Sequence, residues 1–158
     1  MKAKLAAAYE APRAPSQSLP TPHYRILLVE DDEDIRRLNT EVLIRHGYQV
    51  DAAEDGAVAW DALQSNSYNL MVTDNAMPKV TGLELLKKLH GARMALPVIM
   101  ATGTLPTAEF ICSPWLQPTA TMFKPYTLDE LVGTVQEVLR ATEDACERPA
   151  QPPIQPTV

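Results

Sequence analysis

The stretch LLVEDDEDIRRL, residues 27–38, joins an apolar run to five consecutive acids, Glu30 to Asp34. Two unit charges about 5 Å apart repel each other by roughly 3 kcal/mol at an effective dielectric constant of ~20. Something must offset that repulsion at the end of a buried strand. Either the acids spread into solvent at the start of a helix, or some of them converge on a cation.

Outward from this stretch, five strand-like runs alternate with helical patterns. Runs such as ILLV and PVIM are continuously apolar rather than alternating, which is typical of strands buried on both faces. The sequence therefore predicts an α/β fold in which helices cover both faces of a parallel sheet. The expected strands are RILLV (25–29), YQVDAA (48–53), YNLMVTD (68–74), LPVIMAT (96–102) and TATMF (119–123).

Capping signals mark two of the expected helices. Thr81 and Glu84 have the spacing of a capping box, and Thr127 and Glu130 repeat it. A helix that starts near Asp34 is expected to stop at Gly47, and another is expected over 56–65.

The connection between the fourth and fifth strands is rich in proline. Pro114 and Pro118 would interrupt a helix interior, so we expect only a short fourth helix, about 107–112. Irregular chain follows it, and we expect Trp115 and Leu116 in that chain to fill the core.

The two ends of the chain differ from its middle. Of 14 prolines, four lie in residues 12–22 and four in 149–156. Such segments bury too little apolar surface to fold, so we expect disordered Pro-rich tails at 1–23 and 142–158 around one folded domain at 24–141.

Composition excludes several classes of function. The net charge of −6 argues against nucleic-acid binding, which leaves a basic face as its footprint. No apolar run approaches 18 residues, so we expect no membrane span, and the N-terminus does not have the pattern of a signal peptide. Cys112 and Cys146 have neither metal-ligand spacing nor a disulfide framework, which favours a reducing cytoplasm.

Polar residues end four of the expected strands. In a doubly wound sheet, ligands bind beyond the carboxyl ends of the strands, where the strand order reverses. Each residue alone has an ordinary explanation: a solvated cap for the acids, a turn for Asp74, a strand position for Thr102 and the surface for Lys124. Their joint occurrence is what favours a functional site.

The order and spacing of these residues resemble the receiver domain of two-component response regulators, over about residues 24–141. Asp74 is followed by Thr102 after 28 positions, and Lys124 comes 22 positions later. The matching pieces are VEDD (29–32), TDNAMP (73–78), TG (102–103) and FKPYT (123–127). The resemblance implies a flavodoxin-like, doubly wound five-stranded sheet with strand order 2-1-3-4-5.

The resemblance also implies the chemistry. Asp74 matches the phosphoacceptor, which receives its phosphoryl group from a sensor histidine kinase or a histidine phosphotransfer protein. Mg²⁺ would be held by Glu30, Asp31, Asp74 and the backbone carbonyl of Ala76, a small oxygen ligand set of the kind that this ion accepts. The opening question then has two answers: Glu30 and Asp31 face the cation, and the other acids favour the positive end of a helix dipole.

Three further residues complete the implied site. Thr102 would donate its hydroxyl to a phosphoryl oxygen, and Lys124 would pair with the phosphate as a point charge. Pro125 matches the cis-proline that aims the lysine. The protein would be a phosphoacceptor and not a turnover enzyme.

Two features depart from the resemblance. Thr121 stands where many receivers have an aromatic residue that moves inward on phosphorylation, and the fourth helix is atypical. Ala76 and Thr104 also lack the carboxylate or amide that would assist hydrolysis of the acyl phosphate.

Two functions therefore remain open. The first is a single-domain signalling switch or phosphorelay intermediate with a target protein still to be found. The alternative is a constitutive protein-interaction module whose phospho-switching is weakened or lost. In either case the fourth helix, fifth strand and fifth helix would form the output surface, and a homodimer through this surface is one option.

Overall fold

Five parallel strands form a single sheet in the computed structural model, which describes residues 23–104 and 107–147. The strand order is β2-β1-β3-β4-β5, so the order reverses between β1 and β3. This is the flavodoxin-like, doubly wound arrangement, and the predicted fold is confirmed. The strands are β1 (Arg25–Val29), β2 (Gln49–Ala53), β3 (Leu70–Asp74), β4 (Val98–Thr102) and β5 (Ala120–Phe123).

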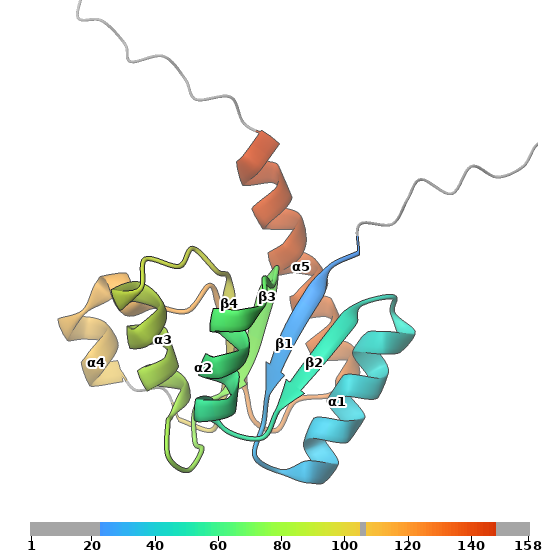
Figure 1. Ribbon diagram of the computed structural model, residues 1–158, viewed down its shortest axis with the longest axis horizontal. Coiled ribbons are helices and arrows are strands. Elements are labelled where there is room, and N and C mark those ends of the chain that lie inside the picture. Colours follow the sequence, from blue (N-terminus) through green and yellow to red (C-terminus); the bar gives the residue numbers. More distant parts are fainter. Residues whose placement is uncertain (1–22, 105–106, 148–158) are drawn as a thin grey trace, which may run out of the picture.

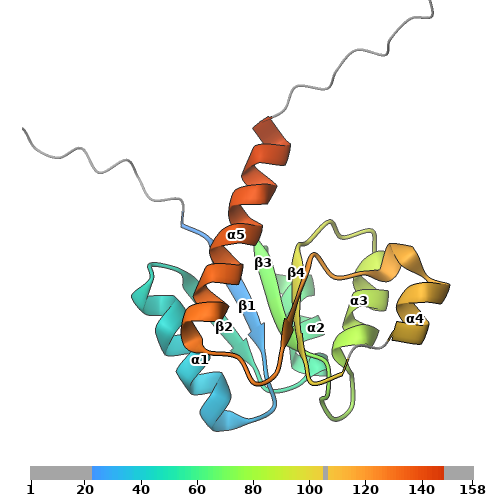
Figure 2. The ribbon, with the colours of Figure 1, turned by 180° about the vertical axis from the view of Figure 1, so that it is seen from behind.

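Helices cover both faces of the sheet, as Figures 1 and 2 show from opposite sides. One face carries α1 and α5, and the other carries α2 and α3. The helices are α1 (Glu33–Arg45), α2 (Gly56–Ser65), α3 (Gly82–Gly91), α4 (Thr107–Cys112) and α5 (Leu128–Glu147), with a 3₁₀ turn, η1 (Pro114–Leu116), after α4.

The strands supply two core layers because successive side chains point to opposite faces. In β1, Leu27 and Val29 pack on the side of α2 and α3, whereas Ile26 and Leu28 pack on the side of α1 and α5. All four are essentially inaccessible to solvent. Burial on both faces explains why this strand is a continuous apolar run, and it leaves only the strand ends for polar groups.

Both predicted capping boxes are present. Thr81 Oγ1 accepts a hydrogen bond from the Glu84 amide, and a Glu84 carboxylate oxygen accepts one from the Thr81 amide. Thr127 and Glu130 make the same reciprocal pair before α5. These contacts satisfy backbone donors at the first turn, which is why the two helices begin where the sequence predicted.

The prediction that Trp115 and Leu116 fill the core is confirmed for Leu116 and wrong for Trp115. Leu116 is only 1% exposed and packs into the layer under α2 and α3. Trp115 is 59% exposed instead, with its ring edge-to-face against His90 at a centroid separation of 5.1 Å. In a 3₁₀ turn, adjacent side chains point about 120° apart, so only one of the two can face the core.

Helix α5 continues past residue 141, where the C-terminal tail was expected to begin. Thr142 Oγ1 donates to the carbonyl of Val138, and the hydroxyl of Tyr24 donates to Glu143. The stretch ATEDACE contains no proline or glycine, so nothing in it stops the helix. The rest of the two expected tails, residues 1–22 and 148–158, lies outside the described residues.

No helix in the described part of the chain, residues 23–104 and 107–147, has the length and apolarity to cross a membrane.

Candidate functional site

Four neighbouring strand ends bring the predicted site residues to one edge of the sheet. The register pairs Val29 with Thr73 and Asp74 with Ala101, so these strands end level with one another. Asp74 and Thr102 are the last residues of β3 and β4. Glu30 and Asp31 follow β1, and Lys124 follows β5.

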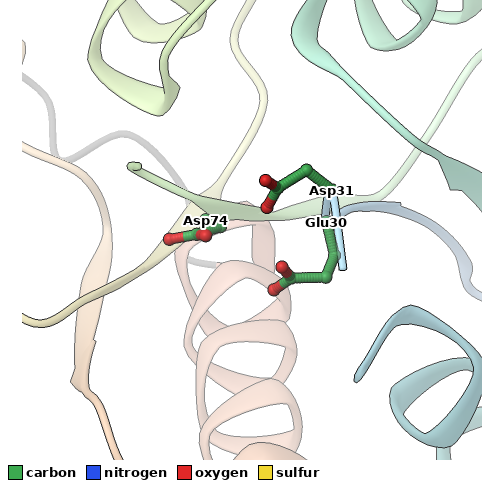
Figure 3. A group of neighbouring side chains, drawn as sticks. All are labelled: Glu30, Asp31 and Asp74. Atoms are coloured by element: carbon green, nitrogen blue, oxygen red, sulfur yellow. The ribbon is translucent and has the colours of Figure 1, made fainter. Parts of the chain in front are cut away.

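Three carboxylates form an acidic cluster at this edge. One oxygen from each of Glu30, Asp31 and Asp74 lies within 4.8 Å of the other two. Figure 3 shows the carboxylates of Glu30 and Asp31 extended to the side on which Asp74 lies. Glu30 is 2% and Asp74 4% exposed, whereas Asp31 is open to solvent. An exposed carboxylate beside two buried ones leaves a route for a hydrated cation.

The next acids have a different role. Asp32 is the N-cap of α1, and its Oδ1 accepts hydrogen bonds from the amides of Asp34 and Ile35, each at 3.0 Å. Glu33 and Asp34 occupy the first turn of α1, where negative charge interacts favourably with the helix dipole. The five acids of the opening stretch therefore divide between the cluster and the start of a helix.

Glu30 is the most perturbed acid of the cluster. Its burial raises the pKa of its carboxyl to about 7, and the charge of Asp74 acts in the same direction. A hydrogen bond from the amide of Asp32 and the charge of Lys124 oppose this rise in pKa. A neighbouring cation would stabilise the ionised form of this buried carboxyl and so lower its raised pKa.

Lys124 supplies a positive charge within the cluster. Its Nζ lies 3.0 Å from Oδ2 of Asp74 and 3.8 Å from Oε2 of Glu30. Partial burial lowers the pKa of Lys124, but the hydrogen bond to Asp74 and the charges of Glu30 and Asp74 outweigh it, so the net pKa is raised. The lysine is therefore held in its charged form against the phosphoacceptor candidate.

The chain that carries Lys124 is fixed to the neighbouring strand. The Lys124 amide donates to the carbonyl of Thr102 at 3.0 Å. The Lys124–Pro125 peptide bond is cis. Thr121 is half-buried within β5 and pairs with Met100 in the sheet.

Thr102 is buried at the end of β4 but does not point its hydroxyl proton at Asp74. Its Oγ1 donates to the carbonyl of Thr104 at 2.6 Å and accepts from the Thr104 amide at 3.3 Å. The hydroxyl is thus engaged within its own loop, and it must rotate to serve a ligand at the acidic cluster.

The loop after Asp74 is held by backbone contacts. The amide of Ala76 donates to Oδ1 of Asp74 at 3.2 Å, and Ala76 itself is exposed. Asn75 donates its amide to Ala101 and accepts the Leu83 amide on its side-chain oxygen at 3.1 Å. The sequence predicted a turn at Asp74 and Asn75, since an Asx residue after a strand is a general turn signal, but the contact of Asn75 with the start of α3 was missed.

Gly82 and Lys79 were also missed. A Cβ on Gly82 would lie 2.6 Å from the carbonyl oxygen of Asp74, so only glycine allows α3 to start this close to the phosphoacceptor candidate. Lys79 has a positive φ of 66° and pairs its Nζ with Oδ2 of Asp55, the N-cap of α2, at 2.6 Å. No local spacing predicts that pair, because its members are 24 residues apart.

The donor set fits a hard divalent cation. The cluster offers three carboxylates and no soft or nitrogen ligand, which suits Mg²⁺, an ion that takes a few oxygens and retains water. An adjacent fixed ammonium group adds a contact for a further anion. The arrangement can hold a phosphoryl group between a cation and a lysine, next to a buried carboxylate.

Comparisons with known proteins agree with this geometry. A family model for the response regulator receiver domain matches residues 26–136. Response regulator MprA of Mycobacterium tuberculosis is 34% identical over 125 residues, which cover 78% of this chain and 54% of that protein. The chain therefore spans about half the length of that relative.

Two other similar proteins match along nearly their whole length. The response regulator receiver protein CpdR of Brucella abortus is 33% identical over 117 residues, covering 74% of this chain and 98% of that protein. The response regulator protein TrrA of Thermotoga maritima, solved in complex with Mg²⁺ and BeF, is 30% identical with a TM-score of 0.63, covering 73% of this chain and 98% of that one. The chain belongs to the response regulator receiver domain family of two-component systems.

Proposed function

We propose that the protein accepts a phosphoryl group on Asp74 and acts as a signalling switch or phosphorelay intermediate. The observation that carries the proposal is the buried Asp74 carboxylate, 3.0 Å from the Lys124 ammonium group and within an oxygen cluster suited to Mg²⁺. The receiver family consists of phosphoacceptor switches rather than turnover enzymes, which agrees with this assignment.

The proposed transfer is a substitution at phosphorus. A carboxylate oxygen of Asp74 forms a bond to phosphorus as the bond from phosphorus to the donor's imidazole nitrogen breaks, and the departing histidine keeps that electron pair. Glu30, Asp31, Asp74 and the carbonyl of Ala76 would hold Mg²⁺, which when bound neutralises phosphoryl oxygens. The product is an acyl phosphate on Asp74.

Two side chains of the protein would stabilise the transferred group. Lys124 would exchange its contact with the Asp74 carboxylate for one with a phosphoryl oxygen. Thr102 would release the carbonyl of Thr104 and donate to another phosphoryl oxygen. Since that hydroxyl now makes a 2.6 Å hydrogen bond, phosphorylation would loosen the loop after β4.

The phosphodonor is a sensor histidine kinase or a histidine phosphotransfer protein in this proposal, since a receiver domain implies a kinase partner. An apolar groove of about 550 Å³ opens beside the site, and Lys124 itself is part of its wall. Exposed apolar side chains of α1 and α5 also line it, which suits contact with a protein surface: Ile35, Leu38 and Leu128. A donor seated there would lie next to Asp74.

The output surface, formed by α4, β5 and α5, carries exposed apolar side chains that suit contact with a partner protein. Ile111 on α4 and Phe123 on β5 are large exposed apolar residues on this side. We propose that they contact a target protein or a second copy of the chain. A cytoplasmic location is part of the same proposal, since Cys112 and Cys146 are both free thiols.

A constitutive interaction module is the second candidate. Thr121 supplies no aromatic side chain to couple the site to the output side, and α4 has only six residues. In that case Asp74 could still accept a phosphoryl group, but the surface formed by α4, β5 and α5 would not respond.

Intact mass spectrometry tests the first proposal. Purified protein is incubated with Mg²⁺ and acetyl phosphate, beside Asp74→Ala, an EDTA control and a matched exposed aspartate variant, Asp61→Ala. We expect a gain of about 80 Da, one phosphoryl group, in the wild type and in Asp61→Ala only. A gain that survives in Asp74→Ala would contradict the assignment.

Hydrogen exchange separates the two candidates. If the domain switches, phosphorylation changes amide exchange over residues 107–123 as well as at the site. If exchange changes only in the loops around Asp74 and Thr102, the protein is the unswitched interaction module.

A further inference from the structure

A buried amide on α1 is bonded to the chain that carries Lys124. Asn39 is only 2% exposed, and its Nδ2 donates to the hydroxyl oxygen of Tyr126 at 2.9 Å. The helix face around Asn39 is otherwise apolar, with Ile35, Val42 and Leu43 at helical spacing. A buried amide is costly unless it is hydrogen-bonded, and among the residues that the structure describes Tyr126 supplies the side-chain partner of Asn39.

The turn that follows β5 is therefore tied down at both of its ends. At the first end, the Lys124 amide is bonded to the carbonyl of Thr102 on β4. At the second, the Tyr126 hydroxyl is bonded to Asn39 on α1. The Lys124 side chain leaves the turn at the first anchor, two residues before Tyr126, and its Nζ lies 3.0 Å from Oδ2 of Asp74.

The phenol of Tyr126 remains protonated in this setting. Its partial burial raises its pKa, while the hydrogen bond from Asn39 acts in the opposite direction, and the charge of Glu30 adds to the rise. A neutral hydroxyl accepts the amide proton at one defined distance and angle. An apolar pair at these positions would fill the same space without fixing that geometry.

We propose that the Asn39–Tyr126 hydrogen bond positions Lys124 at the phosphoacceptor, so that α1 contributes to the reactive geometry without touching the phosphoryl group. The proposal rests on the proposed function of Asp74. Neither Asn39 nor Tyr126 is a catalytic residue; each acts through the position of Lys124.

The location of the pair gives it a second consequence. Asn39 and Tyr126 both line the apolar groove beside the site, together with Lys124. A donor protein that seats in this groove contacts the residue that holds the lysine. Docking and lysine placement are thereby connected through a single side chain, Tyr126.

A double-variant comparison separates positioning from stability. Tyr126→Phe leaves the Asn39 amide buried without its partner, so this variant loses stability as well as geometry. Adding Asn39→Leu removes both polar groups, which can be nearly neutral for stability. The double variant therefore retains a wild-type melting temperature if the pair is simply exchanged for an apolar contact. The matched control is Tyr48→Phe, because Tyr48 is a half-buried tyrosine directly before β2.

Two readouts are measured on the full chain. The first is the initial rate of phosphorylation by acetyl phosphate at saturating Mg²⁺, and the second is amide hydrogen exchange over residues 119–126. We expect the double variant to be phosphorylated about fivefold more slowly than the wild type, because misplacing a reacting group by about 1 Å can cost about 100-fold in rate. We also expect the Lys124 amide to exchange faster in this variant, because the turn has lost one of its two anchors. Tyr48→Phe is expected to match the wild type in both.

Each outcome decides the question. A stable double variant with wild-type rate and wild-type exchange means that the pair only fills the core, and it overturns the proposal. If the wild type itself takes up no phosphoryl group, the proposed function fails, while the exchange data still show whether Asn39 and Tyr126 hold the turn. Faster exchange at Lys124 with unchanged melting temperature supports positioning in either case.

Discussion

Lys124 Nζ lies 3.0 Å from Oδ2 of Asp74, and this ion pair joins the end of β5 to the end of β3 across the strand between them. Burial of Asp74 removes most of the water that would otherwise screen the pair. Among the residues that the structure describes, Lys124 is therefore the positive charge paired with the proposed site of phosphorylation.

Removing this charge tests its role. We expect Lys124→Met to slow phosphorylation by acetyl phosphate at least tenfold, since a preorganised electrostatic contact is typically worth about 100-fold or more in rate. Lys87→Met, at an exposed position on α3, is the control and is expected to leave the rate unchanged. Equal rates for the two variants would mean that Lys124 does not act on the reacting group.

The raised pKa of Glu30 predicts that cation binding is linked to protons. With a pKa of about 7, Glu30 holds a proton below that pH, and Mg²⁺ must displace it. The apparent affinity for Mg²⁺ is expected to rise about tenfold between pH 6 and pH 8, measured by calorimetry. Glu30→Gln is expected to flatten this dependence, and an equally steep profile in that variant would assign the proton to another group.

The same pKa has a consequence for the stability of the metal-free protein. The folded pKa lies above the ordinary value of 4.5, so between these two pH values the folded state binds more protons than the unfolded state. The contribution of Glu30 to the free energy of unfolding is therefore full below about pH 4.5 and is lost as the pH rises through about 7. Urea titrations without Mg²⁺ at pH 5 and pH 8, on the wild type and Glu30→Gln, measure it. A larger wild-type loss of stability than in Glu30→Gln is expected, and parallel losses would contradict it.

The close approach of α3 to the phosphoacceptor loop predicts a contrast between two glycines. Gly82→Ala would place its Cβ 2.6 Å from the Asp74 carbonyl, so we expect it to lower the free energy of unfolding by about 2 kcal/mol and to slow phosphorylation. Gly133→Ala, with open space in α5, is expected to raise the free energy of unfolding by about 0.5–1 kcal/mol. Urea unfolding of both variants checks the signs; a neutral Gly82→Ala would show that α3 can move away.

The turn after α4 predicts another contrast. Leu116→Ala should cost about 2–5 kcal/mol of unfolding free energy, because it opens a cavity under α3. Trp115→Ala, at an exposed position, should change stability by less than about 1 kcal/mol. Thermal unfolding of the two variants measures both losses of stability. A larger loss of stability in Trp115→Ala than in Leu116→Ala would contradict this prediction and would mean that the contact of Trp115 with His90 anchors the turn.

Most of the fold was predictable because its signals are local. Continuous apolar runs mark strands buried on both faces, and the two capping boxes mark helix starts through contacts only three residues apart. The proximity of Glu30, Asp74 and Lys124, the candidate site residues, was predictable because they lie at strand ends, which a parallel sheet brings together in space.

Contacts between distant segments were not predictable. The sequence contains no local sign that Asp55 pairs with Lys79 or that Asn39 meets Tyr126, since each depends on how two elements dock. The 2.6 Å hydrogen bond from the Thr102 hydroxyl to the Thr104 carbonyl depends on the side-chain rotamer of Thr102, which the spacing of residues in the sequence does not determine. Helix α5 extends beyond residue 141, where its end was expected, to Glu147. The polar residues there give no strong helix signal in the sequence, but a contact with a distant residue, the hydrogen bond from Tyr24 to Glu143, stabilises this part of the helix.

Locating the phosphoryl group tests the central claim most directly. The protein is phosphorylated with acetyl phosphate and Mg²⁺, and the acyl phosphate is reduced with borohydride, which converts a phosphorylated aspartate to homoserine. Tandem mass spectrometry then reads the modified position. The account predicts homoserine at position 74 in the wild type and at no position in Asp74→Ala; homoserine at Asp31 or any other aspartate, or none at position 74, would contradict it.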